Sequence, residues 1–422
     1  MSQVPPVDGP IRLAELLDRS RPFADDIVLH DPDGPAECLV RAGELVASHD
    51  DVDAAAQMLG SRVDRVDPVE HADLARIRLR PHVRERSVDL AAELREREPR
   101  LAVTPNHVHI GSPVMFGTPV MFGTGARPTP APLPPSPEPD LWQPPVTVAL
   151  LDTGLDPHPW FAGRRWYSEW GASPEVLDPD GPPEANRQAG HGTFVAGVLL
   201  QHAPGVTVRH HRSLSSLGLT DDVTVAAALR AVRITAAEHG ERLDVVVLTS
   251  GCYTADNQCP PPLRREIERA GDCIVVASAG NAASDRPFWP AALPEVTAVA
   301  ATGLDGALAG FSNYGDWVDA AAAGVNVVSS FVRLVPGQEG GSGGTAPGTT
   351  TRYYGAATWS GTSFAAPMIA AELARLRRSG MPPEEARRKV CELYPPAPGG
   401  PGLPDAAVPG RRQPPRSTEP VL

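Results

Sequence analysis

The spacing of apolar residues divides the chain into two folded regions with different patterns. Between about residues 30 and 110, apolar runs of period two alternate with two helical segments, in the order strand, helix, strand, strand, helix, strand. The segments read "ECLVRAGELVA", "DVDAAAQMLGS", "RVDRVDPVEHADLARIRLR", "SVDLAAELREREP" and "RLAVTPNHVHIG". This order predicts a small α+β domain built on a split βαβ motif.

A longer region, residues 146–395, alternates apolar strands with helices. The predicted strands "VTVALLD", "DVVVLTS", "DCIVVASAG" and "VTAVAAT" are apolar on both faces, and "DDVTVAAALRAVRITAAEHG" is a helical run between two of them. Strands that are apolar on both faces are typical of parallel sheets covered on both sides. The pattern therefore predicts an α/β domain with a mainly parallel sheet and helices on both faces.

Three further segments show neither pattern. Residues 1–25 are rich in Pro and Asp and residues 396–422 in Pro and Gly, so we expect a disordered N-terminal arm and a disordered tail. Residues 113–145 hold a tandem "PVMFGT" and then a proline-dense linker, which should span distance without forming a ladder or a helix. Residues 26–112 and 146–395 are then the two domains. The repeat has three open interpretations: a pseudosubstrate that occupies a cleft, a hairpin that binds a partner, or a neutral duplication.

Composition excludes several classes of partner. The 422 residues carry a formal net charge of −13, which argues against nucleic acid as a partner. No apolar run is long enough to span a membrane, and the first residues lack a cationic segment followed by an apolar one, so we expect a cytoplasmic protein that does not contact membranes. The five cysteines lack metal-type spacing and are expected to be reduced, although Cys252 and Cys259 could close a short loop in an oxidising compartment.

Four polar residues lie where a strand ends or a helix begins. They are Asp152 after "VTVALL", His191 between two glycines, Asn281 after "VVASAG" and Ser363 before "FAAPMIAAELARLRR". A serine hydroxyl becomes a nucleophile when an imidazole removes its proton and a carboxylate orients that imidazole. A side-chain amide can stabilise the oxyanion that then forms. Taken alone, each residue is also explained by helix capping or turn chemistry.

Together these stretches resemble the motifs of the subtilisin-type (subtilase) serine peptidases, which read here Asp152-Thr-Gly, His191-Gly-Thr, Ser278-Ala-Gly-Asn281 and Gly361-Thr-Ser363. The resemblance covers roughly residues 146–385. It implies that Ser363 is the nucleophile and that His191 is the general base and then the general acid. It also implies that Asp152 orients His191 and that Asn281 is the oxyanion donor. The expected function is serine endopeptidase activity, and the alternative is a catalytically silent subtilase fold used as a binding module.

The resemblance further implies how a peptide or protein substrate is bound, namely as an added, extended strand. The substrate-binding residues that it implies are Thr249, Ser250, Gly251, Ser278, Ala279 and Gly280. The family has Ser-Leu-Gly where this chain has Thr-Ser-Gly, so the middle side chain is smaller and polar. Substrate preference therefore stays open.

Two departures from the family concern a histidine and calcium. Phe194 stands where the family often has a second histidine, which leaves the base in place. After the predicted His191 helix the chain runs directly through "QHAPGVTVRH", with no room for the loop that builds a tight calcium site in many relatives. We therefore expect no metal and no cofactor.

Three competing motifs are weaker. A single Asp-Thr-Gly argues against an aspartic peptidase, which needs two carboxylates. "GGSGG" at residues 340–344 fits the α/β-hydrolase elbow, but no histidine follows it, since the last one is His239. A zinc site at His107 and His109 would need further ligands that the neighbouring sequence does not supply.

With this family in view, the ferredoxin-like first domain resembles the inhibitory propeptide domain that many subtilases carry before the catalytic domain. The resemblance implies that the chain after "LAVTPNHVH" lies along the active-site cleft and that the domain restrains its own catalytic domain in cis. More than thirty residues separate "HVHIG" from the first strand of the larger domain. The alternative is an unrelated docking domain.

Overall fold

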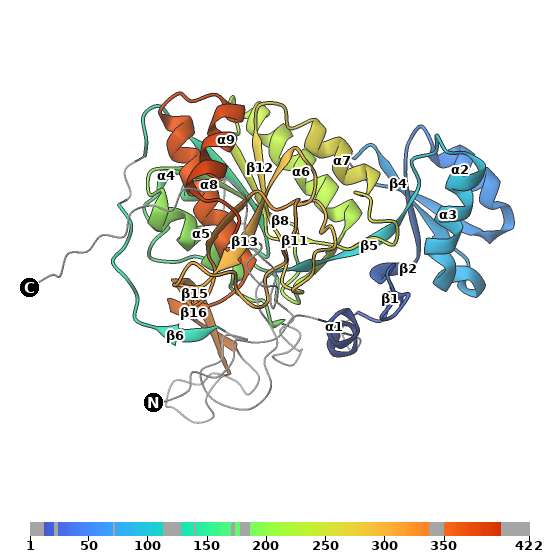
Figure 1. The fold of residues 1–422 in the computed structure, drawn as a ribbon, viewed down its shortest axis with the longest axis horizontal. Helices are drawn as coiled ribbons and strands as arrows, with labels where there is room; N and C mark the ends of the chain where they lie inside the picture. Colours follow the sequence, from blue (N-terminus) through green and yellow to red (C-terminus); the bar gives the residue numbers. More distant parts are fainter. Residues whose placement is uncertain are drawn as a thin grey trace, which may run out of the picture.

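The computed structural model describes residues 12–20, 24–70, 72–112, 128–138, 141–169, 174–177, 186–336 and 350–397. The tandem "PVMFGT", the "GGSGG" stretch and residues 398–422 lie outside the described residues, so the expectations placed on them stay predictions. In Figure 1 a small domain lies beside a larger one, and strand β5 runs between them. Among the described residues we find no helix with the length and apolar character needed to cross a membrane.

The small domain has the element order that the sequence predicts. Its strands and helices are β2 (Cys38–Ser48), α2 (Val52–Leu59), β3 (Val63–Pro68), β4 (Leu74–Leu79), α3 (Ser87–Arg97) and β5 (Thr104–Gly111), with short 3-10 turns at Gly60–Arg62 and Pro81–Arg86. The strands form an antiparallel sheet in the order β5-β2-β4-β3, and β1 (Ile27–His30) pairs with β2. Residues of α2 and α3, such as Ala55 and Leu90, pack with Leu45 and Ile77 of the sheet.

The expectation of disorder over residues 1–25 is wrong for helix α1 (Leu13–Ser20). Leu13, Leu16 and Leu17 occupy one face of this helix and are buried against a cluster that includes Ile110 of β5. The proline and aspartate content of the arm suggested disorder, but three leucines at helical spacing suffice to dock one short helix.

The larger domain confirms the predicted α/β class. Its six strands are all parallel, in the order β14 (Ala320–Ala323), β13 (Val296–Thr302), β12 (Ile274–Ser278), β10 (Val245–Leu248), β7 (Thr147–Asp152) and β8 (Thr207–Arg212). The side chains of neighbouring residues in one strand pack against opposite faces of the sheet. Leu150 packs in the cluster with α5 (His191–His202) and α8 (Thr362–Arg378). Leu151 packs in the cluster with α6 (Asp222–Glu238) and α7 (Pro261–Glu268).

Shorter elements complete the described structure. Helix α4 (Arg165–Glu169) precedes α5, and α9 (Pro383–Leu393) follows α8. Strands β15 (Val327–Pro336) and β16 (Thr350–Trp359) pair antiparallel, and β6 (Thr129–Ala131) adds to β16. The expectation that the proline-rich linker forms no ladder is therefore wrong at β6. An edge strand tolerates Pro130, because one side of such a strand needs no donor.

Strand β5 continues from the small domain into the larger one. Beyond its pairing with β2 it pairs antiparallel with β9 (Leu219–Asp221) and with β11 (Ser250–Gly251). The two domains thus share one sheet, and the carboxyl end of β5 lies at the carboxyl edge of the large parallel sheet.

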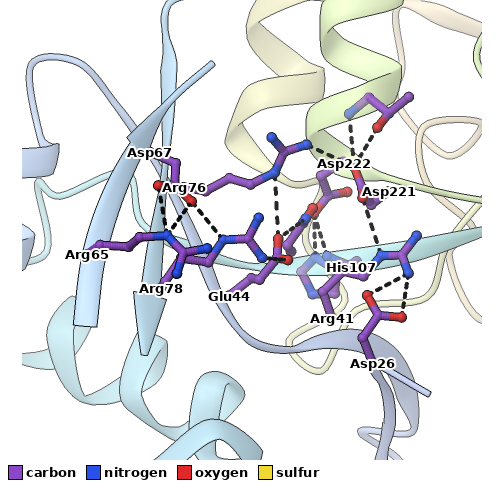
Figure 2. Close-up of polar contacts among 12 residues, drawn as sticks. Asp26, Arg41, Glu44, Arg65, Asp67, Arg76, Arg78, His107, Asp221 and Asp222 are labelled. Carbon is purple, nitrogen blue, oxygen red and sulfur yellow. Dashed lines mark hydrogen bonds and ion pairs between the residues drawn. The ribbon is translucent and has the colours of Figure 1, made fainter. Parts of the chain in front are cut away.

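Charged side chains reinforce this junction (Figure 2). Arg41 of β2 donates to Asp26 at 2.9 Å and to Asp221 at 3.3 Å. Asp221 in turn accepts the backbone N–H of Thr224 and so caps helix α6. Arg76 of β4 lies between Glu44 and Asp221, at 3.6 and 3.9 Å. Arginines of the small domain therefore face a carboxylate of the larger domain.

Candidate active site

Asp152 and His191 form a buried pair at the carboxyl edge of the parallel sheet. Asp152 is the last residue of β7, and His191 is the first residue of α5. The His191 Nδ1 and Asp152 Oδ1 atoms lie 2.7 Å apart, and both side chains are fully buried. The Thr249 hydroxyl donates to the other carboxylate oxygen at 2.5 Å, and the Thr153 N–H donates to Oδ1 at 2.7 Å.

These contacts set the charge of the pair. Burial alone would raise the pKa of Asp152, but the facing His191 and the donors on Thr249 and Thr153 hold that pKa below its ordinary value. An ionised carboxylate fixes the proton of a neutral imidazole on Nδ1, which leaves Nε2 as the acceptor. His191 Nε2 is buried and has no hydrogen-bond partner among the described residues.

Ser363 lies next to this pair but does not bond to it. It is the second residue of helix α8, and its hydroxyl donates to the Thr249 carbonyl at 3.2 Å. Thr249 therefore joins the three residues, since its hydroxyl contacts Asp152 and its carbonyl accepts from Ser363. The His191 ring packs against Trp359 and Phe364, with centroid distances of 5.6 and 5.4 Å. In an unreacted site the hydrogen bond between nucleophile and base is often long or absent.

Asn281 is oriented by Thr362, a residue far away in the sequence. The backbone N–H and the hydroxyl of Thr362 both donate to Asn281 Oδ1, at 3.1 and 3.0 Å. The amide nitrogen must then point the other way, and it donates to the carbonyl oxygen of Ser112 at 2.5 Å. The Ser363 N–H donates to the same oxygen at 3.2 Å. Two donors that converge on one carbonyl oxygen have the geometry of an oxyanion hole.

The carbonyl oxygen that accepts from Asn281 and Ser363 belongs to Ser112, the residue that follows β5. The Ser112 N–H donates to the Thr249 carbonyl at 2.9 Å, and the Gly111 N–H donates to the Gly218 carbonyl at 3.0 Å. In the register of the pairing, Ser250 lies opposite Gly111, and Gly251 lies opposite Ile110. The structure thus places Thr249, Ser250 and Gly251 alongside an extended segment of the same chain.

Ser278, Ala279 and Gly280 lie on another side of Asn281. The Gly280 N–H donates to the Thr362 hydroxyl at 3.1 Å, and the Ala279 carbonyl accepts from the Asn313 amide at 2.7 Å. Ser278 Oγ is buried without a partner among the described residues. Among the described residues, the hydrogen bonds of Ser278, Ala279 and Gly280 stabilise the loop that carries Asn281. None of these bonds is made to β5.

Sequence reasoning missed four residues of the site. Ser112 supplies the seated carbonyl, Thr362 orients Asn281, and Asn313 accepts the N–H groups of Ala282 and Ser284 at 2.9 and 3.1 Å. The fourth is Glu175, which accepts the Gly190 N–H at 2.6 Å. Burial raises the pKa of Glu175 to about 8. Only Thr362 carried a local signal, as the middle residue of Gly-Thr-Ser.

The cysteines are free in the structure, so Cys252 and Cys259 do not pair. Both thiols are buried, which raises their pKa values and keeps them protonated.

Comparison with known proteins adds independent findings. A model of the subtilase family matches residues 144–392. The chain is 31% identical over 259 residues to the thermophilic serine proteinase of Bacillus sp. (strain AK1), which covers 58% of this chain and 55% of that protein. It is 28% identical to subtilisin BL of Lederbergia lenta over 246 aligned residues. These residues cover 55% of this chain and 76% of that protein. The chain thus spans about half the length of the first of these relatives.

One solved structure shares the fold over more of the chain. Fervidolysin from Fervidobacterium pennivorans, described as a keratinolytic enzyme related to subtilisin, aligns with a TM-score of 0.51 and 21% identity. The alignment covers 83% of this chain and 57% of that structure.

Proposed function

Because this chain belongs to the subtilase family, we propose that it is a serine endopeptidase that uses Asp152, His191 and Ser363, with Asn281 as oxyanion donor. The observation that carries this proposal is the carbonyl oxygen of Ser112, which accepts hydrogen bonds from the Ser363 N–H and the Asn281 amide. A backbone carbonyl held by these donors stands beside Ser363 as the carbonyl of a cleaved peptide would.

The reaction follows from these positions. Ser363 Oγ attacks the substrate carbonyl carbon while its proton passes to His191 Nε2, and the carbonyl oxygen becomes an oxyanion that Asn281 and the Ser363 N–H stabilise. The carbon–nitrogen bond then breaks, and His191 returns the proton to the leaving nitrogen. A water molecule hydrolyses the acyl-enzyme by the same steps and regenerates Ser363. Throughout, Asp152 holds the imidazole and offsets its positive charge.

We also propose that the small domain restrains this site in cis. Strand β5 fills the position of an added substrate strand between β9 and β11, so a substrate strand cannot enter while β5 is seated. Because the inhibitory strand belongs to the same chain, its effective concentration is high even if its intrinsic affinity is modest. The hydrogen bonds that hold the Ser112 carbonyl beside Ser363 favour this role over that of an unrelated docking domain.

The bond that follows the seated carbonyl is Ser112–Pro113. When a peptide bond is hydrolysed, the leaving nitrogen accepts a proton from the general acid. A proline nitrogen carries a ring carbon where other residues carry hydrogen, and the ring fixes rotation about N–Cα. Both features hinder the approach of His191 to that nitrogen, so we propose that the bond resists hydrolysis and that the small domain stays attached.

A second function, a catalytically silent binding module, is favoured by one observation. The Ser363 hydroxyl bonds to the Thr249 carbonyl, and His191 Nε2 has no partner among the described residues. In a silent module this arrangement would persist. In an enzyme the serine rotates toward His191 when it reacts.

A fluorophosphonate probe distinguishes the two functions, because it reacts with an activated serine. The variant to test is Gly111→Phe in the full chain. A Cβ at the buried Gly111 would already lie 2.2 Å from Gln188 Oε1 and 2.9 Å from Leu214 Cδ2. These side-chain ends can move away from a methyl group, but a phenyl ring needs far more room and should displace β5. Mass mapping should find the adduct on Ser363, and Gly111→Phe/Ser363→Ala should carry none. If the folded Gly111→Phe chain carries no adduct, the binding module is the correct function.

A further inference from the structure

Strand β5 carries two histidines whose side chains meet one carboxylate of the larger domain. His107 Nδ1 and the His107 N–H both contact Asp222 Oδ2, at 2.8 and 2.9 Å, and His109 Nε2 contacts Asp222 Oδ1 at 2.8 Å. Asp222 is the first residue of α6 and is fully buried, as is His109, while His107 is nearly so. Figure 2 shows His107 pointing from β5 toward Asp222. None of these residues takes part in the proposed hydrolysis.

A cysteine lies at the same place. Gly251, the last residue of β11, pairs with Ile110 of β5, and Cys252 follows directly after it. The ligand atoms of His109, Asp222 and Cys252 lie within 4.8 Å of one another. Within the described part of the chain, the Cys252 sulfur has no hydrogen bond, and His109 Nδ1 is buried without a partner. A thiol without a hydrogen bond and an imidazole therefore lie next to a buried carboxylate.

We propose that His109, Asp222 and Cys252 bind one divalent transition-metal ion at the junction of the two domains, and that the ion is Zn²⁺. Imidazole nitrogen, thiolate sulfur and carboxylate oxygen together are the donor set that zinc prefers, whereas calcium and magnesium take oxygen alone. Zinc holds such ligands at about 2.0–2.3 Å, which requires ligand atoms about 3.3–3.8 Å apart. The ligand atoms of the observed cluster lie within 4.8 Å of one another, so a small rearrangement reaches those distances, in which His109 Nε2 and Asp222 Oδ1 move apart from 2.8 Å to admit the ion.

Charge balance supports the assignment. Cys252 loses its thiol proton to solvent as its sulfur binds, and the resulting thiolate together with the Asp222 carboxylate neutralises the two charges of Zn²⁺. His109 stays neutral and contributes a lone pair, its single proton moving to the ring nitrogen that does not bind. A fully buried ion with balanced charge avoids most of the penalty of burying a cation.

His107 has a supporting position in this site. Its ring and its backbone N–H both donate to Asp222 Oδ2, which fixes the carboxylate and leaves Oδ1 toward His109. Histidine–carboxylate contacts of this kind around a metal ligand typically contribute about 10–100-fold to metal affinity. His107→Gln should therefore weaken binding by that factor without removing the site.

The ligands come from two domains, so the complete site exists only when β5 is docked. His109 belongs to the small domain, and Asp222 and Cys252 belong to the larger one. An ion that binds only the docked state stabilises it in proportion to its concentration. The existence of the site does not depend on the proposed function, although its effect on the cleft does, because a bound ion would hold β5 more firmly in place.

Cobalt reports directly on such a site, because Co²⁺ bound to a thiolate in tetrahedral geometry shows charge-transfer and ligand-field absorption. The full chain with Ser363→Ala, which prevents self-digestion, is freed of metal with a chelator and titrated with Co²⁺ and then with Zn²⁺. The bands should saturate at one equivalent of Co²⁺ and disappear when Zn²⁺ displaces it. Cys252→Ser, which is nearly isosteric, should lose the charge-transfer band, and the matched control Cys391→Ser should keep it.

Two results of the Co²⁺ titration would overturn the proposal. One is a folded chain that shows no thiolate charge-transfer band with Co²⁺, and the other is a band that survives in Cys252→Ser. Circular dichroism verifies that each variant is folded. A second readout is the melting temperature, which Zn²⁺ should raise in the parent chain and in Cys391→Ser but not in Cys252→Ser. Equal shifts in all three would also contradict the site.

Discussion

The carbonyl oxygen of Ser112 lies 3.2 Å from the backbone nitrogen of Ser363. These residues come from different domains, and the contact is part of a wider set in which Asn281 donates to the same oxygen and Thr249 accepts the Ser112 N–H. The relationship connects two proposals. It defines where a substrate carbonyl would be polarised, and it shows which segment of the chain must leave before a substrate can bind.

Removal of the Asn281 amide should slow the reaction more than it weakens substrate binding. In the Gly111→Phe background, where β5 is displaced, Asn281→Ala should lower kcat by about 10²–10³-fold with little change in KM. The reason is that the amide meets full negative charge only in the transition state. Steady-state hydrolysis of a fluorogenic peptide measures both constants. A rise in KM with unchanged kcat would show that Asn281 merely binds the substrate.

Thr362→Val tests how Asn281 is positioned. The change removes the hydroxyl that donates to Asn281 Oδ1 but keeps the backbone donor of residue 362. In the same background kcat should fall by less than for Asn281→Ala, on the order of tenfold, because one of the two orienting bonds is retained. The double variant with Asn281→Ala should be no slower than Asn281→Ala alone. Additive losses would mean that Thr362 acts independently of the amide.

Replacement of Pro113 should turn the seated bond into a substrate. The wild-type chain should stay intact at Ser112–Pro113, while Pro113→Ser should release fragments 1–112 and 113–422, which intact-mass spectrometry identifies. Pro113→Ser/Ser363→Ala is the matched control and should remain whole. Cleavage of the wild-type chain after Ser112 would contradict the argument from the proline nitrogen.

Glu175 predicts how stability depends on pH. Burial raises the folded-state pKa of its carboxyl from the ordinary 4.5 to about 8, and nearby Asp156 and Asp152 add to the shift. The protonated carboxyl therefore makes its full contribution to the stability of the folded state below about pH 4.5. This contribution is lost as pH rises to about 8. Glu175→Gln keeps an acceptor for the Gly190 N–H but cannot ionise.

The melting temperature of Glu175→Gln should match that of the wild type near pH 4.5 and exceed it increasingly up to about pH 8. Each kcal/mol of difference corresponds to about 2–4 °C for a domain of this size. Differential scanning calorimetry at several pH values measures the trend. A difference that does not vary with pH would show that Glu175 keeps an ordinary pKa.

Much of the larger domain could be predicted from the sequence because its signals are local. Fully apolar strands fixed the parallel sheet, and strand-end and helix-start positions singled out Asp152, His191, Asn281 and Ser363. Their convergence was not visible in the pattern and rested on the family resemblance. The split βαβ order of the small domain could also be predicted from local patterns. Helix α1 could not, because the Pro and Asp content of the arm suggested disorder and only three leucines indicated a helix.

Contacts between distant segments could not be predicted. The seating of Ser112 depends on the register of β5 against β9 and β11, which no single stretch encodes. His107 and His109 lacked neighbouring ligands in the sequence, but Asp222 meets them from more than a hundred residues away. The orientation of the Asn281 amide likewise depends on Thr362, which lies 81 residues further along.

The most direct test of the central claim, that β5 restrains a working active site, compares peptide hydrolysis by the full-length wild type and Gly111→Phe. Gly310→Phe is the matched control, because a side chain at Gly310 meets no atom within 4 Å. We predict that Gly111→Phe hydrolyses the peptide at least about tenfold faster than the wild type, equivalent to about 1.4 kcal/mol of weakened restraint, while Gly310→Phe matches the wild type. Equal rates for the wild type and a folded Gly111→Phe would contradict the account.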